Sequence, residues 1–245
     1  MNCLKIYPIK TIIILFSLLV IILGRGDYLF YHFVLKMISI IIFFTIFFVG
    51  WNSREFTGEH SFLFIAIACM IIGLFDIFHM ITYNGTVFFD YIVPDIHSKL
   101  WVAARLTESF SLLIALLILK YHKFINIDLV FSIYFLLTMI ILFDILYYQK
   151  IFPVCFVEGR GFTRFRICSE CLIILTFLFS IYLIVKEKGL LHPQLRQLAL
   201  ISLSLSVIAE VFISLNAYNP YNFTHMLGQI FKVLALVYLF RALVE

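Results

Sequence analysis

Long apolar runs alternate with short polar segments along the whole chain. Leu, Ile, Phe and Val dominate eight runs of 15–23 residues, and a helix needs about 20 mainly apolar residues to cross a bilayer. Turn-forming residues such as Gly159 and Pro193 lie between the runs. The pattern predicts a single membrane-embedded domain over residues 1–245, an all-α bundle of about eight transmembrane helices with spans at 9–23, 35–51, 62–81, 99–119, 125–147, 167–185, 195–215 and 222–244.

The first run, Ile9–Leu23, has two interpretations. Lys5 and Lys10 flank its start, as in a secretory signal, but the run ends at Leu23 without a cleavage site of small residues. We therefore expect a retained first span. Because the run has only 15 residues, a total of seven spans stays open.

Composition agrees with a membrane protein. The chain is 64% hydrophobic and 13% charged, whereas soluble domains have roughly 45–50% apolar and about 25% charged residues. The lipid bilayer is therefore an expected partner. The net charge of +4 is spread over the loops without a basic run, which argues against nucleic-acid binding. Cys168 and Cys171 are three apart, but no second pair follows, so the sequence predicts no zinc site.

The distribution of Lys and Arg between loops predicts the orientation. With eight spans, the side that carries both termini holds nine Lys and Arg residues and the other side holds five. Lys36 and Lys99, at the edges of their predicted spans, change the count to nine against seven. We expect both the N- and the C-terminus in the cytoplasm.

Ionisable residues also occur inside the predicted spans, where each costs about 2.5–3.5 kcal/mol on insertion scales and usually faces the protein interior. Residues three or four apart share one helix face. Four spans each carry such a polar stripe: Asp76 and His79; Trp101, Arg105 and Glu108; Ser206, Glu210 and Ser214; and His225, Gln229 and Lys232. Since lipid-facing stripes would be costly, we expect the four stripes to meet in a common interior.

Carboxylates outnumber permanent cations in the predicted spans. The carboxylates are Asp76, Glu108, Asp144, Glu170 and Glu210, and the cations are Arg105 and Lys232. The excess requires bound cations, protons, water or a shallower position for some members. Taken singly, these groups also fit structural roles, such as a local Arg105–Glu108 pair or a Lys232–Glu210 pair between helices. Taken together, they favour a functional pocket.

The loop from Tyr148 to Arg166 is rich in aromatic and apolar residues. Phe152, Phe156 and Phe162 accompany Glu158, which precedes the turn-permitting glycines of this loop. The loop either folds back as a lid over the pocket or forms an aromatic belt at the membrane interface.

Four stretches carry a family resemblance: GLFDIFH at Gly73–His79, WVAARLTE at Trp101–Glu108, IFPVCFVEGRGFT at Ile151–Thr163 and HMLGQIFK at His225–Lys232. With these stretches in order, the chain resembles the third class of bacterial membrane-associated sensor (MASE) domains over residues 10–243. The resemblance implies a sensory module of the bacterial inner membrane that precedes a histidine kinase, a GGDEF-type diguanylate cyclase or a PAS domain. It implies sensing roles at the matching positions Asp76, His79, Trp101, Arg105, Glu108, Glu158 and His225.

We therefore predict a non-enzymatic input module that binds an unidentified small ligand or stimulus in an intramembrane polar pocket. Its partner would be a cytoplasmic histidine kinase, diguanylate cyclase or other protein of two-component or cyclic di-GMP signalling. The candidate sensing residues are Asp76, His79, Trp101, Arg105, Glu108, Glu158, Glu170, Glu210, His225 and Lys232. The sequence ends at Glu245, directly after the last predicted span, so we expect either a stand-alone module or part of a longer polypeptide. A homodimer is compatible with the sequence, although no GxxxG motif supports one.

The sequence is also compatible with other functions. A small transporter or a proton- or ion-translocating protein also uses intramembrane Asp, Glu and His, but the chain shows no internal repeat. No cofactor is predicted. Haem or a metal at His79, His225 and Asp76, or a Schiff base at Lys232, is a weaker alternative. A hydrolase is weaker still, because the G-x-S-x-G and H-E-x-x-H motifs are both missing.

Overall fold

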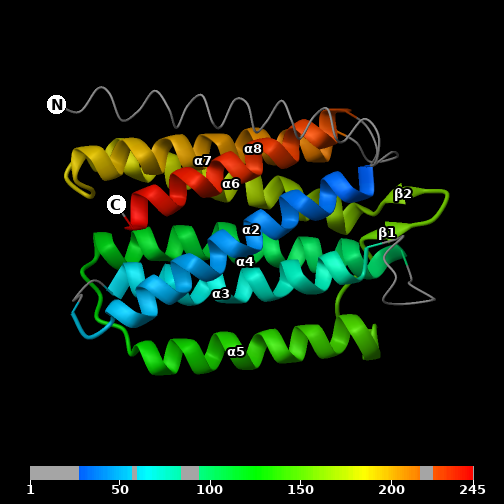
Figure 1. Ribbon diagram of the computed structural model, residues 1–245, viewed down its shortest axis with the longest axis horizontal. Helices are drawn as coiled ribbons and strands as arrows, with labels where there is room; N and C mark the ends of the chain where they lie inside the picture. Colours follow the sequence, from blue (N-terminus) through cyan, green and yellow to red (C-terminus); the bar gives the residue numbers. More distant parts are fainter. Residues whose placement is uncertain (1–27, 57–59, 84–93, 216–222, 245) are drawn as a thin grey trace.

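A computed structural model describes residues 28–56, 60–83, 94–215 and 223–244, so the predicted span 9–23 lies outside the described residues. Within them, seven long helices run side by side and alternate in direction along the chain (Figure 1). All seven are long and apolar enough to cross a membrane. They are α2 (Tyr28–Ser53), α3 (His60–Ile81), α4 (Pro94–Lys120), α5 (Ile127–Phe143), α6 (Arg164–Lys186), α7 (Pro193–Ser214) and α8 (Phe223–Val244). The predicted all-α transmembrane bundle is confirmed.

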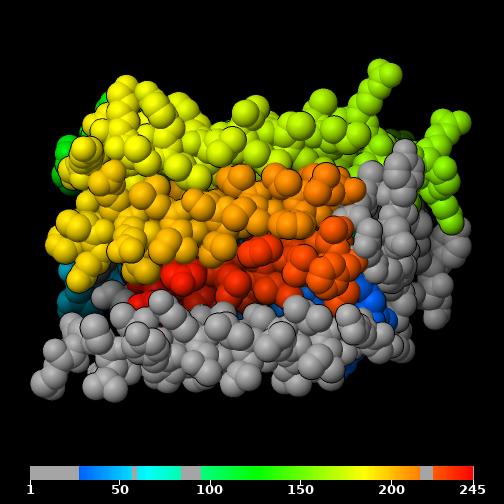
Figure 2. All heavy atoms as spheres, turned by 90° about the horizontal axis from the view of Figure 1, so that it is seen from above, coloured from blue at the N-terminus to red at the C-terminus, as the bar shows by residue number. Residues whose placement is uncertain are grey.

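Six of the helices form a closed ring. Packing runs from α2 to α3, α4, α6, α7 and α8, and α8 packs back against α2. The fifth helix, α5, stands outside the ring against α3 and exposes most of its apolar side chains. Figure 2 shows α6, α7 and α8 lying side by side across one face. The inside of the ring is therefore where the polar stripes can meet.

A small β-hairpin closes one end of the bundle (Figure 1). The helix α5 continues into a π-helical turn, η1 (Asp144–Tyr148), and the chain then forms β1 (Phe156–Val157) and β2 (Gly161–Phe162). The strands pair antiparallel, with Phe156 opposite Phe162. Gly159 and Gly161 have φ angles of +77° and +81°, which glycine adopts without strain. We call this end of the bundle the hairpin end.

The helix bounds differ from the predicted spans at two functionally important places. The helix α2 begins at Tyr28 rather than Leu35, and α4 begins at Pro94 rather than Lys99. Lys36 and Lys99 therefore lie within helices and not at span edges. Lys99 is buried and pairs with Asp95 one turn earlier, at 3.1 Å.

A glycine brings α8 close to α7. A Cβ atom at Gly228 would come within 3.0 Å of the carbonyl oxygen of Ala209 and would collide with the side chain of Ile213. Small residues allow helix backbones to approach in this way inside membranes. The contact fixes α8, which carries His225 and Lys232, against α7, which carries Glu210.

Candidate functional site

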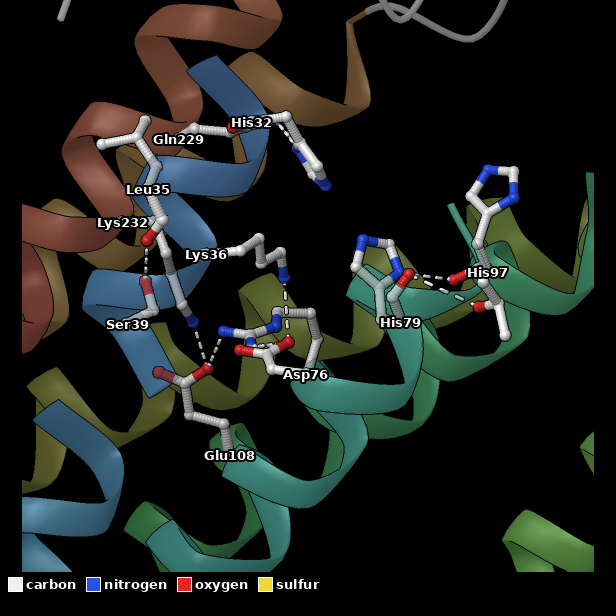
Figure 3. Close-up of polar contacts among 12 residues, drawn as sticks. His32, Leu35, Lys36, Ser39, Asp76, His79, His97, Glu108, Gln229 and Lys232 are labelled. Carbon is white, nitrogen blue, oxygen red and sulfur yellow. Dashed lines mark hydrogen bonds and ion pairs between the residues drawn. The ribbon is translucent and has the colours of Figure 1, made fainter. Parts of the chain in front are cut away.

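A chain of five charged side chains joins four helices in the bundle interior (Figure 3). Lys36 of α2 pairs with Asp76 of α3, with 2.8 Å between Nζ and Oδ1, and Arg105 of α4 donates to the same carboxylate at 3.2 Å. Arg105 also donates to Glu108 one turn along α4, and Glu108 accepts from Lys232 of α8. The side chains are at most 12% exposed. We call these five residues the ionic network.

Helix geometry explains this convergence. Arg105 and Glu108 are three apart and share a face of α4, as the sequence predicted. Lys36 joins them because α2 begins eight residues earlier, at Tyr28, which places Lys36 about two turns inside the helix. The prediction that this lysine lies at a span edge was therefore wrong, and the network holds three cations and two carboxylates.

Two of the other predicted intramembrane carboxylates have local partners. Glu170 accepts from Nε of Arg166 at 3.0 Å, one turn earlier on α6. Asp144 accepts from the backbone N–H groups of residues 150–152 at 2.7–3.3 Å and so fixes the loop after η1. The predicted excess of carboxylates is smaller than expected, because Lys36 and Arg166 lie among them and leave five carboxylates against four cations.

The hairpin covers the network from one end. Asp95 at the start of α4 accepts from the backbone N–H groups of Cys155 and Phe156, each at 2.7 Å, and holds the hairpin down. The guanidinium of Arg166 lies 3.6 Å from the ring centre of Phe162 and 4.8 Å from that of Trp101, distances typical of cation–π contacts.

The same guanidinium is fixed by two polar contacts. Arg166 donates to the hydroxyl of Ser98 at 2.8 Å as well as to Glu170. The side chain of Arg166 therefore connects the hairpin to α4 and α6. This arrangement supports the lid interpretation of the loop.

Aromatic and imidazole rings line the space beneath the hairpin. The rings of His32 and Tyr83 stack with their centres 4.3 Å apart, and the ring of His79 is 5.6 Å from that of His32. His97 is 5.2 Å from Tyr83 and 6.0 Å from His79. Nδ1 of His79 lies 2.7 Å from the carbonyl oxygen of His97. Because a carbonyl only accepts, Nδ1 carries the proton and Nε2 of neutral His79 offers a lone pair.

Gln229 connects this ring cluster to α8. Its Nε2 lies 2.8 Å from Nδ1 of His32 and 3.1 Å from Nδ1 of His225 (Figure 3 shows the first contact). The hydroxyl of Tyr28 is 2.8 Å from the same nitrogen of His225. Polar contacts thus join the hairpin end of α2 to the first two turns of α8.

The network and the ring cluster surround one cavity of about 140 Å³. Glu210 of α7 lines it from the side opposite α3 and α4 in the ring. The residue is 0% exposed, and neither of its carboxylate oxygens has a hydrogen-bond partner in the part of the chain that the structure describes. Nε2 of His32 and Nε2 of His79 are also buried without a partner there. Buried polar atoms normally have partners, so this cavity has unmet hydrogen-bonding capacity.

The structure brings most of the predicted site residues to this cavity. Those that line it are Asp76, His79, Trp101, Arg105, Glu210, His225 and Lys232. Glu108 pairs with Arg105 in the ionic network, and Glu170 pairs with Arg166. Glu158 is placed apart, because it is exposed on the turn between β1 and β2.

Several cavity residues were not predicted: His32, Lys36, Tyr83, His97, Ser98 and Arg166. His32 and Lys36 are four residues apart and therefore share one helix face. This shared face can be recognised only if the helix begins at Tyr28, because the predicted span begins at residue 35. Tyr83 and His97 flank residues 84–93, and no local pattern shows that α3 and α4 bring their rings together.

Outside the spanning helices, burial raises the pKa of the Cys155 thiol to about 12, and the neighbouring Asp95 carboxylate adds to the rise. Cys155 therefore stays a neutral thiol at physiological pH. Among the described residues, no three His, Cys, Asp or Glu side chains are placed to hold a metal ion.

An interior polar cavity enclosed by membrane-spanning helices defines a class of membrane protein in which ionisable groups mark a functional site. The family model described as MASE3, membrane-associated sensor domain, matches residues 23–245. The chain therefore belongs to the MASE3 family of membrane-associated sensor domains, and the resemblance found in the sequence is confirmed. No curated protein matches the chain, and no solved structure matches it either.

Proposed function

We propose that this sensor domain binds a small polar ligand in the cavity beneath the hairpin and signals through α8 to a cytoplasmic partner. The expected partner is a histidine kinase or a diguanylate cyclase. The domain would lie in a bacterial inner membrane with both termini in the cytoplasm, so the hairpin end would face outward and receive the ligand.

The observation that carries this proposal is the carboxylate of Glu210, which lies beside the cavity and has no hydrogen-bond partner among residues 28–56, 60–83, 94–215 and 223–244. Burying polar groups without partners is unfavourable by about 1–3 kcal/mol each, so each such group calls for an explanation such as a functional role or a bound water or ion. A purely structural core would pair or omit them.

The ionic network would transmit the signal, because it connects α8 to the other helices around the cavity. Lys232 of α8 is tied to α4 through Glu108, and α8 packs closely on α7 at Gly228. A ligand that contacts Glu210 and the histidines would bind one arrangement of α8 better than another, which is the requirement for shifting an equilibrium between two states. Movement of α8 would then reach its far end near Arg241.

Binding and transport assays on the purified full chain test this function. The chain is reconstituted in liposomes, and a collection of small polar solutes is screened for thermal stabilisation and for flux. We expect solutes that stabilise the protein without crossing the liposome membrane. A solute that is carried across at a rate dependent on Glu210 would instead show the transporter alternative.

A further inference from the structure

The free carboxylate of Glu210 restricts the chemistry of the ligand. A buried carboxylate is stable when it holds a proton or is paired with a cation. Neither of its oxygens accepts a hydrogen bond among the described residues. In the ionic network, Lys36 donates to Asp76, Lys232 donates to Glu108, and Arg105 donates to both of these carboxylates. The partner of an ionised Glu210 therefore has to come from the cavity.

Among the described residues, the other unpartnered polar atoms of the cavity include a donor, Nε of Arg105, and two acceptors in addition to the oxygens of Glu210. In the neutral form of His79, Nε2 offers a lone pair when Nδ1 donates to the carbonyl of residue 97. Oε1 of Gln229 is also buried without a partner among the described residues. Acceptors from α3, α7 and α8 thus face one space. An anionic ligand would add further acceptors, whereas a ligand with several N–H donors would satisfy them.

The size of the cavity and the side chains that line it further restrict the class of ligand. The cavity of about 140 Å³ is close to the volume of about 150 Å³ that admits benzene in an engineered protein cavity, so a ligand of roughly six non-hydrogen atoms fits. The aromatic side chains of Tyr83 and Trp101 line it. Aromatic faces attract organic cations.

We propose that the cavity binds a small organic ammonium ion whose N–H groups donate to Glu210 and His79. The ammonium supplies three N–H donors to the carboxylate oxygens of Glu210 and to Nε2 of His79, which have no hydrogen-bond donor among the described residues, while its carbon skeleton contacts the aromatic wall. This inference rests on the proposed function, since it names the ligand class for the same cavity.

The test compares four small molecules that share a hydroxyethyl-like skeleton and differ at one end. Ethanolammonium carries N–H donors and a positive charge, choline carries the charge without N–H donors, ethylene glycol is neutral, and glycolate is an anion. Binding to the detergent-purified full chain is measured by calorimetry and by thermal unfolding at constant ionic strength. The variants are Glu210→Gln, which removes the charge at nearly constant shape, and Glu187→Gln, which makes the same change in an exposed ion pair at the other end of the bundle.

We expect ethanolammonium to bind the wild type and Glu187→Gln equally, and to bind Glu210→Gln roughly tenfold or more weakly, as for loss of a buried charged hydrogen bond. Choline is expected to bind more weakly than ethanolammonium. Glycolate or ethylene glycol binding as tightly as ethanolammonium would overturn the ammonium class but leave a ligand-binding cavity. The ammonium class would also be overturned if ethanolammonium did not bind, or if it bound Glu210→Gln as tightly as the wild type. Ethanolammonium flux through Glu210 would keep the ligand class and refute the sensor function.

Discussion

Lys36 of α2 and Asp76 of α3, forty residues apart in the chain, form an ion pair in the bundle interior with 2.8 Å between Nζ and Oδ1, in which Asp76 is buried and Lys36 is partly buried. The pair brings α2 into the ionic network, which otherwise joins only α3, α4 and α8. It also places a cation beside the cavity. The pair is therefore expected to matter both for stability and for the shape of the site.

Replacing Lys36 by Met should lower stability. Removing one partner of a buried pair usually costs about 3–5 kcal/mol, because the other charge loses compensation. The matched change Lys120→Met removes the more exposed ion pair with Glu187 and should cost about 0–1 kcal/mol. Thermal unfolding of both variants in the same detergent measures the difference. Equal unfolding temperatures of the two variants would show that the Lys36–Asp76 pair does not stabilise the fold more than the exposed pair does.

Sequence periodicity predicted much of this arrangement. Asp76, Arg105, Glu210 and Lys232 meet inside the ring because spacings of three and four residues set one face of each helix, and lipid penalises any other orientation. The same periodicity does not predict the role of Lys36, since the start of α2 is less apolar than its middle and the apolar run begins only at Leu35.

Sequence periodicity does not predict contacts between segments that are distant in the chain. Arg166 appeared to belong to a loop, yet it lies in the first turn of α6 and wedges between Trp101 and Phe162. The aromatic loop and its glycines are compatible with a lid or with an aromatic belt at the membrane interface. Which residue of that loop faces the cavity depends on the strand register, which places Phe156 and Phe162 there and leaves Glu158 on the exposed turn.

Gly228→Ala should loosen or shift α8. The added methyl group would meet the side chain of Ile213 and the carbonyl oxygen of Ala209, and overpacking of this kind typically costs about 1–3 kcal/mol. The unfolding temperature should fall, and ligand binding in the cavity should weaken as Lys232 moves. Gly189→Ala is the control, because a Cβ atom there meets no atom within 4 Å. Identical behaviour of the two variants would contradict the close approach of α7 and α8.

The thiol of Cys155 should resist alkylation. Its pKa is raised to about 12 by burial, so at pH 8 roughly one molecule in ten thousand carries the reactive thiolate, given that each pH unit below the pKa is a tenfold change. Asp95→Ala removes the carboxylate that holds the hairpin at Cys155 and Phe156 and should make the thiol reactive. Peptide-level mass spectrometry after iodoacetamide treatment measures the modification at this position. Rapid labelling of Cys155 in the wild type would show that the hairpin is not closed over it.

Phe162→Ala should open the cavity to solvent solutes. The ring of Phe162 covers the guanidinium of Arg166, which in turn lies over Trp101. In a Trp51→Phe background, the fluorescence of Trp101 should be quenched more efficiently by acrylamide after Phe162→Ala. The control Val157→Ala changes an exposed side chain of the same hairpin and should leave quenching unchanged. No difference between the two hairpin variants would argue against a lid.

The most direct measurement joins the full chain, at the end of α8, to a reporter kinase domain and records its output as small polar compounds are added to cells. A compound that alters the output of the wild type should lose its effect in Glu210→Gln and Lys36→Met, and should keep it in Glu187→Gln. Membrane levels of all variants are measured in parallel by immunoblotting. If the response survives unchanged in both cavity variants, the cavity beneath the hairpin is not the sensing site.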